Sequence, residues 1–143
     1  METQPLRYAV IGAGGISHVH LNDILAKPGV SLVGVADPAD PGHWRLPAAH
    51  RGAPQYQDAE TLLRATRPDL VSICTPNKFH APSALLAFKH GAHVACEKPM
   101  AMTVAEAEAM EAARTAAGRL GGINFSYRNV AAFRFARELI AGG

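Results

Sequence analysis

LRYAVIGAGGIS, residues 6–17, has the pattern of a buried strand that leads through a glycine-rich turn into a helix. The strand part is largely apolar without strict alternation, which is typical of a strand covered on both faces. The turn has the spacing G-x-G-x-x-S, with Ser17 where the dinucleotide-binding fingerprint has its third small residue. In such a turn Gly12 permits the sharp bend and Gly14 lets the backbone approach a pyrophosphate. The helix then offers N–H groups to that anion.

Short apolar runs and helical patterns alternate along the rest of the chain. Strands are expected at 6–11, 31–36, 55–57, 70–75, 93–96 and 122–125, and helices at 15–26, 58–65, 82–90, 103–117 and 130–140. The fourth helix opens with a capping box formed by Thr103 and Glu106. Helical periodicity predicts an apolar side on the first helix and an apolar face on the last, made by Ile16, Val19, Leu21, Ile24 and Leu25 and by Val130, Phe133, Ala136 and Ile140, respectively. This alternation predicts an α/β fold, a doubly wound parallel Rossmann-type sheet of about six strands in the order 3-2-1-4-5-6.

The length of 143 residues suits one domain, and 48% hydrophobic against 18% charged residues argues against disorder. A net charge of +2 with scattered basic residues argues against a nucleic-acid or membrane surface. The start, residues 1–5, lacks the parts of a signal peptide. Two cysteines make no disulfide framework, so Cys74 and Cys96 are expected to be buried free thiols in a cytoplasmic protein.

The stretch 37–54 is irregular because it holds four of the ten prolines, namely Pro38, Pro41, Pro47 and Pro54. A helix expected after the second strand would be short or broken at Pro47. Trp44 is expected to pack against the domain. The alternative is that Trp44 forms a stacking platform for an adenine.

Asp37 ends the second expected strand, 23 residues after Gly14. An acidic residue at this place hydrogen-bonds an adenosine ribose in dinucleotide-binding domains. No arginine follows directly, so a ribose 2′-phosphate would meet a carboxylate, and the sequence favours NAD over NADP. The competing interpretation is a turn-forming Asp-Pro pair.

Three further polar clusters follow the carboxyl ends of expected strands. Thr75-Pro76-Asn77 with His80 follows the fourth strand, Glu97-Lys98-Pro99 the fifth, and Tyr127-Arg128 the sixth. Ligands of open α/β sheets bind outside the carboxyl ends, where the strand order reverses. The glycine loop and residues 75–77 would form two walls of such a site, and Lys98 and Arg128 would extend one wall.

At these residues the chain resembles the N-terminal half of the Gfo/Idh/MocA oxidoreductases, which include glucose–fructose oxidoreductase and inositol dehydrogenase. The matching stretches are 10–16, 34–37, 74–77 with His80, 97–101 and 124–128. The resemblance implies an NAD(P) cofactor and hydride exchange with a sugar, polyol or related carbonyl compound. It implies cofactor contacts at Gly12, Gly14, Gly15, Ile16, Asp37, Thr75, Pro76, Asn77, His80, Glu97, Lys98 and Arg128.

The same resemblance implies that Lys98 is the catalytic residue, as an acid/base or polarising group beside the nicotinamide, and that Glu97 contacts the nicotinamide side or holds Lys98. Partial burial beside a cationic nicotinamide would lower the pKa of Lys98 towards working pH. A cis Lys98–Pro99 peptide would aim the side chain into the cleft. Simpler alternatives are a solvated charge at Lys98, a surface salt bridge at Arg128, and a helix-start histidine at His80.

The family's second domain, a sheet-rich substrate domain, has no counterpart in residues 1–143, which we expect to form a single dinucleotide-binding domain. Two functions stay open: an NAD(P)-dependent oxidoreductase completed by a substrate domain, and a binding module without turnover. A methyltransferase is a third, against which residues 97–99 argue. We expect no metal site, since His18 and His20 point apart on one helix. Apolar surface left bare would favour self-association.

Overall fold

The computed structural model describes residues 4–143 as one α/β domain, with one six-stranded sheet whose paired strands all run parallel. The strands are β1 (Leu6–Ile11), β2 (Val30–Ala36), β3 (Gln55–Tyr56), β4 (Leu70–Ile73), β5 (His93–Cys96) and β6 (Gly121–Ile123). Their order is β3-β2-β1-β4-β5-β6, as the sequence predicts. Residues 1–3, which belong to the stretch that lacks the parts of a signal peptide, lie outside the described residues.

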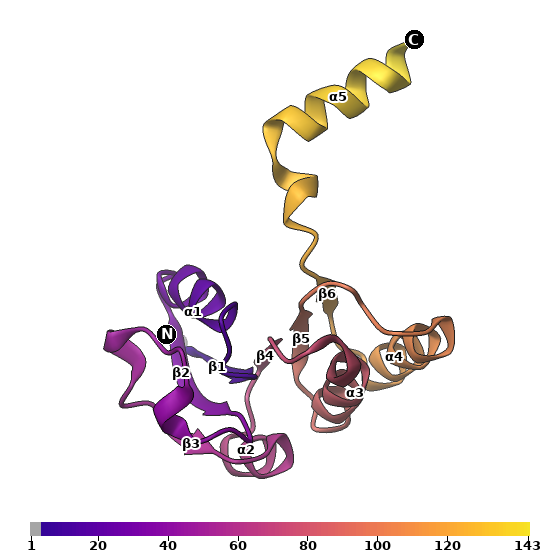
Figure 1. The fold of residues 1–143 in the computed structure, drawn as a ribbon. Coiled ribbons are helices and arrows are strands. Elements are labelled where there is room, and N and C mark those ends of the chain that lie inside the picture. The colour runs from indigo at the N-terminus through magenta and orange to yellow at the C-terminus, as the bar shows by residue number, and fades with distance from the viewer. Residues whose placement is uncertain (1–3) are drawn as a thin grey trace.

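Helices cover the two faces of the sheet unequally (Figure 1). The helices are α1 (Ser17–Leu25), α2 (Ala59–Thr66), α3 (His80–Lys89), α4 (Val104–Ala117) and α5 (Ala131–Gly142). One face packs under α2, α3 and α4 around a core that includes Leu62, Val71 and Phe88. The other face carries α1 over Tyr8 and Val10. The strand order reverses between β1 and β4, so their carboxyl ends open the crevice where such folds bind ligands.

Several element boundaries differ from the sequence prediction. α3 begins at His80 rather than at 82, because Pro82 stands in the first turn, where its missing N–H is not needed. β4 ends at Ile73, and β6 covers 121–123 rather than 122–125 because Gly121 pairs with Val94. On α1 the buried side chains are Ser17, His20 and Leu21, whereas the expected apolar face includes Ile16 and Val19, which are exposed.

The stretch after β2 forms two short 3₁₀ turns, η1 (Pro41–His43) and η2 (Ala48–His50), in place of a helix, as its prolines predict. Trp44 is half-buried and packs against the core beside α1. Its indole Nε1 donates to the Ala39 carbonyl oxygen at 2.9 Å. The packing interpretation of Trp44 is therefore the one that the structure supports.

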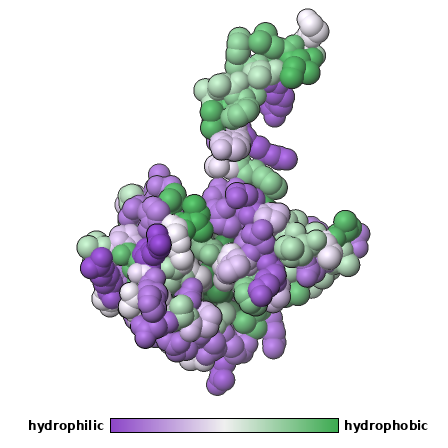
Figure 2. Space-filling model, in the orientation of Figure 1, coloured by the Kyte–Doolittle hydropathy of each residue, from purple (hydrophilic) through white to green (hydrophobic). Residues whose placement is uncertain are grey.

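The last helix projects from the body of the domain together with η4 (Ser126–Asn129), and we call residues 125–142 the arm (Figure 1). The arm is exposed throughout and carries apolar side chains, among them Phe133 and Ile140 (Figure 2). These two residues belong to the apolar face that the sequence predicts, and the Phe133 ring lies against Tyr127 of the same arm, with the ring centres 5.4 Å apart. No helix among residues 4–143 is long and apolar enough to cross a lipid bilayer.

Candidate functional site

A cavity of about 620 Å³ lies at the carboxyl ends of β1, β2 and β4. Its walls include Gly12, Gly14 and Gly15 of the glycine loop, which we define as residues 12–15. The loop is tied to both neighbouring strands, because the Gly12 N–H donates to the Ala36 carbonyl oxygen at 2.7 Å and the Cys74 N–H to that of Ile11 at 2.7 Å. The predicted crevice is thus present at the predicted strands.

Gly12 cannot be replaced without moving backbone. Its φ is +97°, and a Cβ there would lie 2.6 Å from the carbonyl carbon of Cys74 and 2.7 Å from the Thr75 nitrogen. At Gly14 and Gly15 a Cβ would meet nothing within 4 Å, so the backbone there faces open space. The loop therefore combines one enforced glycine with two positions that leave room for a ligand against the main chain.

The residues present fit the adenosine and pyrophosphate part of a dinucleotide. The hydroxyl oxygen of Thr75, on the cavity wall, is buried and has no hydrogen-bond partner, which is unusual for a buried hydroxyl. Ile16 precedes α1 and makes no side-chain cap, so the N–H groups of the first turn are not taken by a side chain there. The Ser17 and Val19 N–H groups donate to the carbonyl oxygens of Gly14 and Ile16, at 3.2 Å and 3.1 Å, so the helix N-terminus favours an anion chiefly through its dipole.

Asp37 lies on the cavity wall at the end of β2 and is locked by two backbone donors. Its Oδ2 accepts the Ala13 N–H at 2.8 Å, and its Oδ1 accepts the Ala39 N–H at 2.8 Å. Each carboxylate oxygen keeps a further acceptor site, which a ribose hydroxyl could use. Among the described wall residues there is a second acid, Asp58, and no lysine or arginine.

Sequence reasoning missed part of this cavity. Its wall also includes Pro38, Gln57, Asp58, Phe79 and Ser83. Phe79 could have been found from its place between Asn77 and His80, but residues 57 and 58 reach the cavity only because β3 pairs with β2. Trp44, the alternative adenine platform, is not on the wall.

The turn after β4 is held by His80 rather than by its own side chains. The ring of His80 is buried, with Nδ1 at 2.6 Å from the Pro99 carbonyl oxygen and Nε2 at 3.0 Å from that of Thr75. His80 therefore starts α3 and also joins this turn to the segment that follows β5. Pro76 caps η3 (Asn77–Phe79), and the exposed Asn77 begins it.

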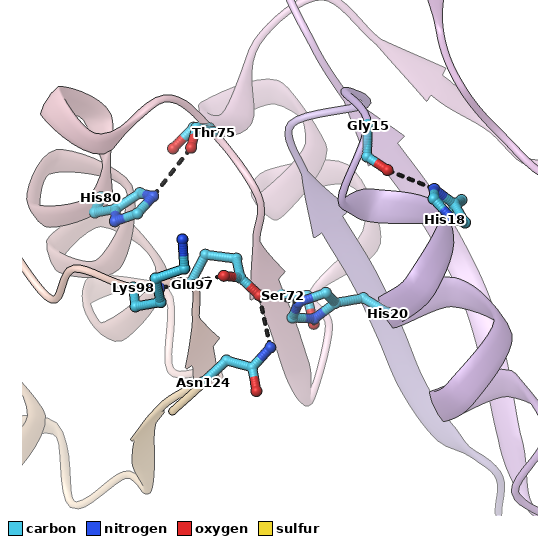
Figure 3. Close-up of polar contacts among 9 residues, drawn as sticks. All are labelled: Gly15, His18, His20, Ser72, Thr75, His80, Glu97, Lys98 and Asn124. Carbon is cyan, nitrogen blue, oxygen red and sulfur yellow. Dashed lines mark hydrogen bonds and ion pairs between the residues drawn. The ribbon is translucent and has the colours of Figure 1, made fainter. Parts of the chain in front are cut away.

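Lys98 lies in the turn after β5, residues 97–99, which we call the Lys98 turn. Lys98 and Pro99 of this turn are exposed. The Lys98–Pro99 peptide is cis, one of the two isomers that the sequence leaves open. Figure 3 shows the Lys98 side chain pointing to the side of the site where Thr75 and His80 lie. The lysine is exposed, so any partial burial of its amine has to come from a ligand or another covering surface.

Glu97 is buried in a polar cluster that the sequence did not reveal. Its Oε1 accepts from His20 Nε2 at 2.8 Å and from Asn124 Nδ2 at 2.6 Å, and its Oε2 accepts the Lys98 N–H at 3.3 Å (Figure 3). Burial alone would raise the pKa of Glu97, but the hydrogen bonds from His20 and Asn124 outweigh it and hold the pKa below its usual value. Glu97 is therefore a buried carboxylate that accepts hydrogen bonds from neighbouring groups of the protein, and it is not among the wall residues of the cavity.

Arg128 is not brought to the cavity or to the Lys98 turn. It lies on the arm, with its guanidinium carbon 5.3 Å from the centre of the Phe125 ring, and faces a hollow with Phe133, Arg134 and Arg137. Its cofactor contact stays a prediction. His18 and His20 diverge as expected, since His18 is exposed and contacts the Gly15 carbonyl, whereas His20 is buried.

Both cysteines are buried free thiols, as expected. Burial, with the negative charge of Glu97 as a lesser contribution, raises the pKa of Cys74 and of Cys96 to about 12. A thiol with such a pKa is protonated at neutral pH and is a poor nucleophile. Cys74 therefore contributes an apolar side chain to the cavity wall and no covalent chemistry.

Comparison with known proteins agrees with this geometry. Residues 6–125 match the family described as "Oxidoreductase family, NAD-binding Rossmann fold", GFO_IDH_MocA. The chain is 34% identical over 144 aligned positions to D-glucoside 3-dehydrogenase of Escherichia coli, covering 100% of this chain and 41% of that protein. It is 31% identical to inositol 2-dehydrogenase of Rubrobacter xylanophilus, covering 99% of this chain and 41% of that protein.

A solved structure with the same fold is the WlbA dehydrogenase from Bordetella pertussis in complex with NADH and UDP-GlcNAcA. The TM-score is 0.87 with 26% sequence identity, covering 98% of this chain and 43% of that one. The chain thus spans about two-fifths of the length of these relatives. On its strand order, its glycine loop and the match over residues 6–125, the chain belongs to the Gfo/Idh/MocA family of oxidoreductases and forms its NAD-binding Rossmann fold.

Proposed function

We propose that this chain binds NAD in the cavity between β1, β2 and β4 and forms the cofactor half of a sugar or polyol oxidoreductase. The observation that carries the proposal is the wall itself, where the glycine loop, Asp37 and the unpartnered hydroxyl of Thr75 meet around one cavity. The relatives named above are a glucoside dehydrogenase and an inositol dehydrogenase, which supports a polyhydroxylated substrate.

NAD is preferred over NADP in this proposal because of the charge on the wall. Asp37 and Asp58 both border the cavity, and no basic residue among its described wall residues could pair with a 2′-phosphate. A phosphate carrying about two negative charges would face two carboxylates, which is repulsive in a partly enclosed site.

The chemical step assigned to this chain is a proton transfer at Lys98. A bound nicotinamide supplies the hydride acceptor or donor. Lys98 Nζ would take the proton of the reacting hydroxyl or return it to the carbonyl, as a positioned general base or acid. Glu97 is given no part in this proton transfer, because its carboxylate is buried and its Oε1 already accepts from His20 and Asn124.

The second candidate is an NAD-binding module without turnover of its own. It is favoured by the exposure of Lys98 and by the distance of the arm, with Arg128, from the body of the domain (Figure 1). An open site neither orients a substrate nor excludes water, so proximity and preorganisation are largely lost. In this reading the described residues form a dinucleotide-binding domain that catalyses no reaction of its own.

Two further properties belong to the proposal. The chain associates with itself, because exposed apolar side chains gather on the arm, including Phe133, Leu139 and Ile140. A sharp monomer peak in size-exclusion chromatography at high protein concentration would contradict this. The two buried free thiols suit a reducing compartment, and we place the protein in the cytoplasm.

Calorimetric titration with NADH and NADPH tests the cofactor proposal. NADH should bind at least about tenfold more tightly than NADPH, a difference of about 1.4 kcal/mol. Asp37→Ala should remove most of the NADH affinity. Asp23→Ala, which replaces an exposed acid on α1, should leave the NADH affinity unchanged. If millimolar NADH and NADPH leave the melting temperature of the wild type unchanged, the chain binds neither, and the proposal is wrong.

A dehydrogenase assay on a panel of polyols then separates the two candidates. Turnover that disappears in Lys98→Ala, with NADH affinity retained, selects the oxidoreductase. NADH binding without turnover of any polyol selects the module.

A further inference from the structure

Four polar side chains from different parts of the sheet meet beneath the Lys98 turn (Figure 3). His20 comes from α1, Ser72 from β4, Glu97 from the end of β5 and Asn124 from the end of β6. His20 Nδ1 lies 3.0 Å from Ser72 Oγ, and His20 Nε2 lies 2.8 Å from Glu97 Oε1. His20, Ser72 and Glu97 are each buried, so this is an interior network and not a surface ion pair.

The hydrogen-bonding partners of His20 determine which of its ring nitrogens carries the proton. A carboxylate only accepts hydrogen bonds, so His20 Nε2 carries the proton that it shares with Glu97 Oε1. In the neutral ring Nδ1 then accepts from the Ser72 hydroxyl, and every polar atom of the pair has a partner. Without His20 the buried carboxylate would lose one of its two side-chain donors, and a buried charge with unmet hydrogen bonds is costly.

The network connects α1, which follows the glycine loop, with the Lys98 turn. α1 begins directly after the glycine loop, and His20 lies one turn into that helix. At the other end, Glu97 Oε2 accepts the backbone N–H of Lys98 at 3.3 Å. The helix that faces the cofactor and the turn that carries Lys98 are therefore connected through one side-chain pair, His20 and Glu97.

We propose that His20 is a positioning residue: it holds Glu97 against α1 and so fixes the Lys98 turn relative to the glycine loop. This inference rests on the proposed function in assigning Lys98 its role. His20 does not line the cavity and does not touch the site of the cofactor. Its action is indirect and shows itself in the environment of the Lys98 amine.

The test uses the small number of lysines in this chain. There are four, Lys27, Lys78, Lys89 and Lys98, so ¹³C-methylation of the amines gives a short NMR spectrum that Lys98→Arg assigns. In the wild type, NADH should shift the Lys98 resonance. In His20→Phe, which keeps the ring volume and loses both hydrogen bonds, that resonance should move before NADH is added and no longer respond to it. NADH should still bind within about threefold of the wild-type affinity, since the cavity wall is unchanged.

A second histidine–glutamate pair provides the matched control. His90 Nε2 lies 3.0 Å from Glu60 Oε1, and this pair is more exposed and away from the Lys98 turn. His90→Phe should leave the Lys98 resonance and its response to NADH unchanged. His20→Gln, which can still donate to Glu97, should restore much of the wild-type behaviour.

A chemical rescue keeps the test decisive if His20→Phe does not fold. His20 borders a hollow of about 340 Å³ together with Asn124 and Asp23, which gives a small molecule access to the site. In His20→Ala, added imidazole should return the Lys98 resonance towards its wild-type position.

An unmoved Lys98 resonance in folded His20→Phe or His20→Ala overturns the inference, and so does a shift that neither glutamine nor imidazole reverses. If the wild type does not bind NADH but its Lys98 resonance still changes in His20 variants, the proposed function is wrong and the positioning role of His20 holds.

Discussion

The two halves of the site differ in how complete they are. The cavity half, formed by the glycine loop, Asp37 and Thr75, has a defined wall and backbone hydrogen bonds that hold its acid in place. The Lys98 half has a buried foundation in Glu97 and His20, but its functional side chain is exposed, and Arg128 lies apart on the arm. The described residues thus wall the cavity half and leave the Lys98 half open.

The two halves meet different requirements of the proposed function. A bound dinucleotide needs backbone donors, an acid for its ribose and room against the glycine loop, and the cavity half has all three. A catalytic lysine needs a substrate placed beside it and exclusion of water, and the Lys98 half has neither among the described residues.

The largest effect is expected from Gly12→Ala in the cavity half. A positive φ and a Cβ pressed to 2.6 Å from the Cys74 carbonyl carbon would together destabilise the fold by about 3 kcal/mol, combining backbone strain and overpacking. The melting temperature should fall by roughly 10 °C, and NADH binding should be lost.

Gly52→Ala is the matched control, because a Cβ there would meet nothing within 4 Å. Thermal unfolding of both variants checks the prediction. A Gly12→Ala protein that melts within a degree or two of the wild type would show that the close approach of β1 to the segment after β4 is not required.

Much of the cavity half can be predicted from the sequence, because its determinants are local. The glycine spacing, the apolar first strand and Asp37 lie within 32 residues, and strand–helix alternation fixes the strand order through right-handed crossovers. The low cysteine count likewise indicates free thiols, whereas the sequence leaves the isomer of the Lys98–Pro99 peptide open.

The buried contact between His20 and Glu97 in the Lys98 half could not be predicted in this way. His20 and Glu97 are 77 positions apart, and only the placement of α1 over the sheet brings them together. Helical periodicity assigned Ile16 and Val19 to the face with Leu21, but α1 turns Ser17 and His20 inwards instead. A buried polar pair wins over apolar periodicity here because the hydrogen bonds of Glu97 outweigh the gain from burying one exposed valine.

A smaller effect is expected at Glu97, and it depends on pH. The pKa of Glu97 lies below its unfolded value of 4.5, so the carboxylate adds stability that is complete above that pH and is lost as pH falls through the lower folded value. Glu97→Gln should cost about 1–2 kcal/mol of unfolding free energy at pH 7. The difference from the wild type should shrink in more acidic buffer.

Urea unfolding at neutral pH and in a series of buffers below pH 4.5 measures this dependence. Glu60→Gln, at the more exposed pair with His90, serves as the control and should change stability much less. A stability difference between Glu97→Gln and the wild type that stays constant down the pH series would mean that Glu97 is not held as a carboxylate by its neighbours.

The smallest effect is expected from Arg128→Gln on the arm. Arg128 contacts the Phe125 ring and lies with Arg134 and Arg137 away from the cavity wall, so NADH affinity should change by less than about twofold. Arg134→Gln should behave in the same way, and calorimetry on both variants gives the comparison. A tenfold loss confined to Arg128→Gln would show that the arm folds back over the cofactor. The two halves of the site would then be joined within one chain, and the contrast between a complete and an incomplete half would no longer hold.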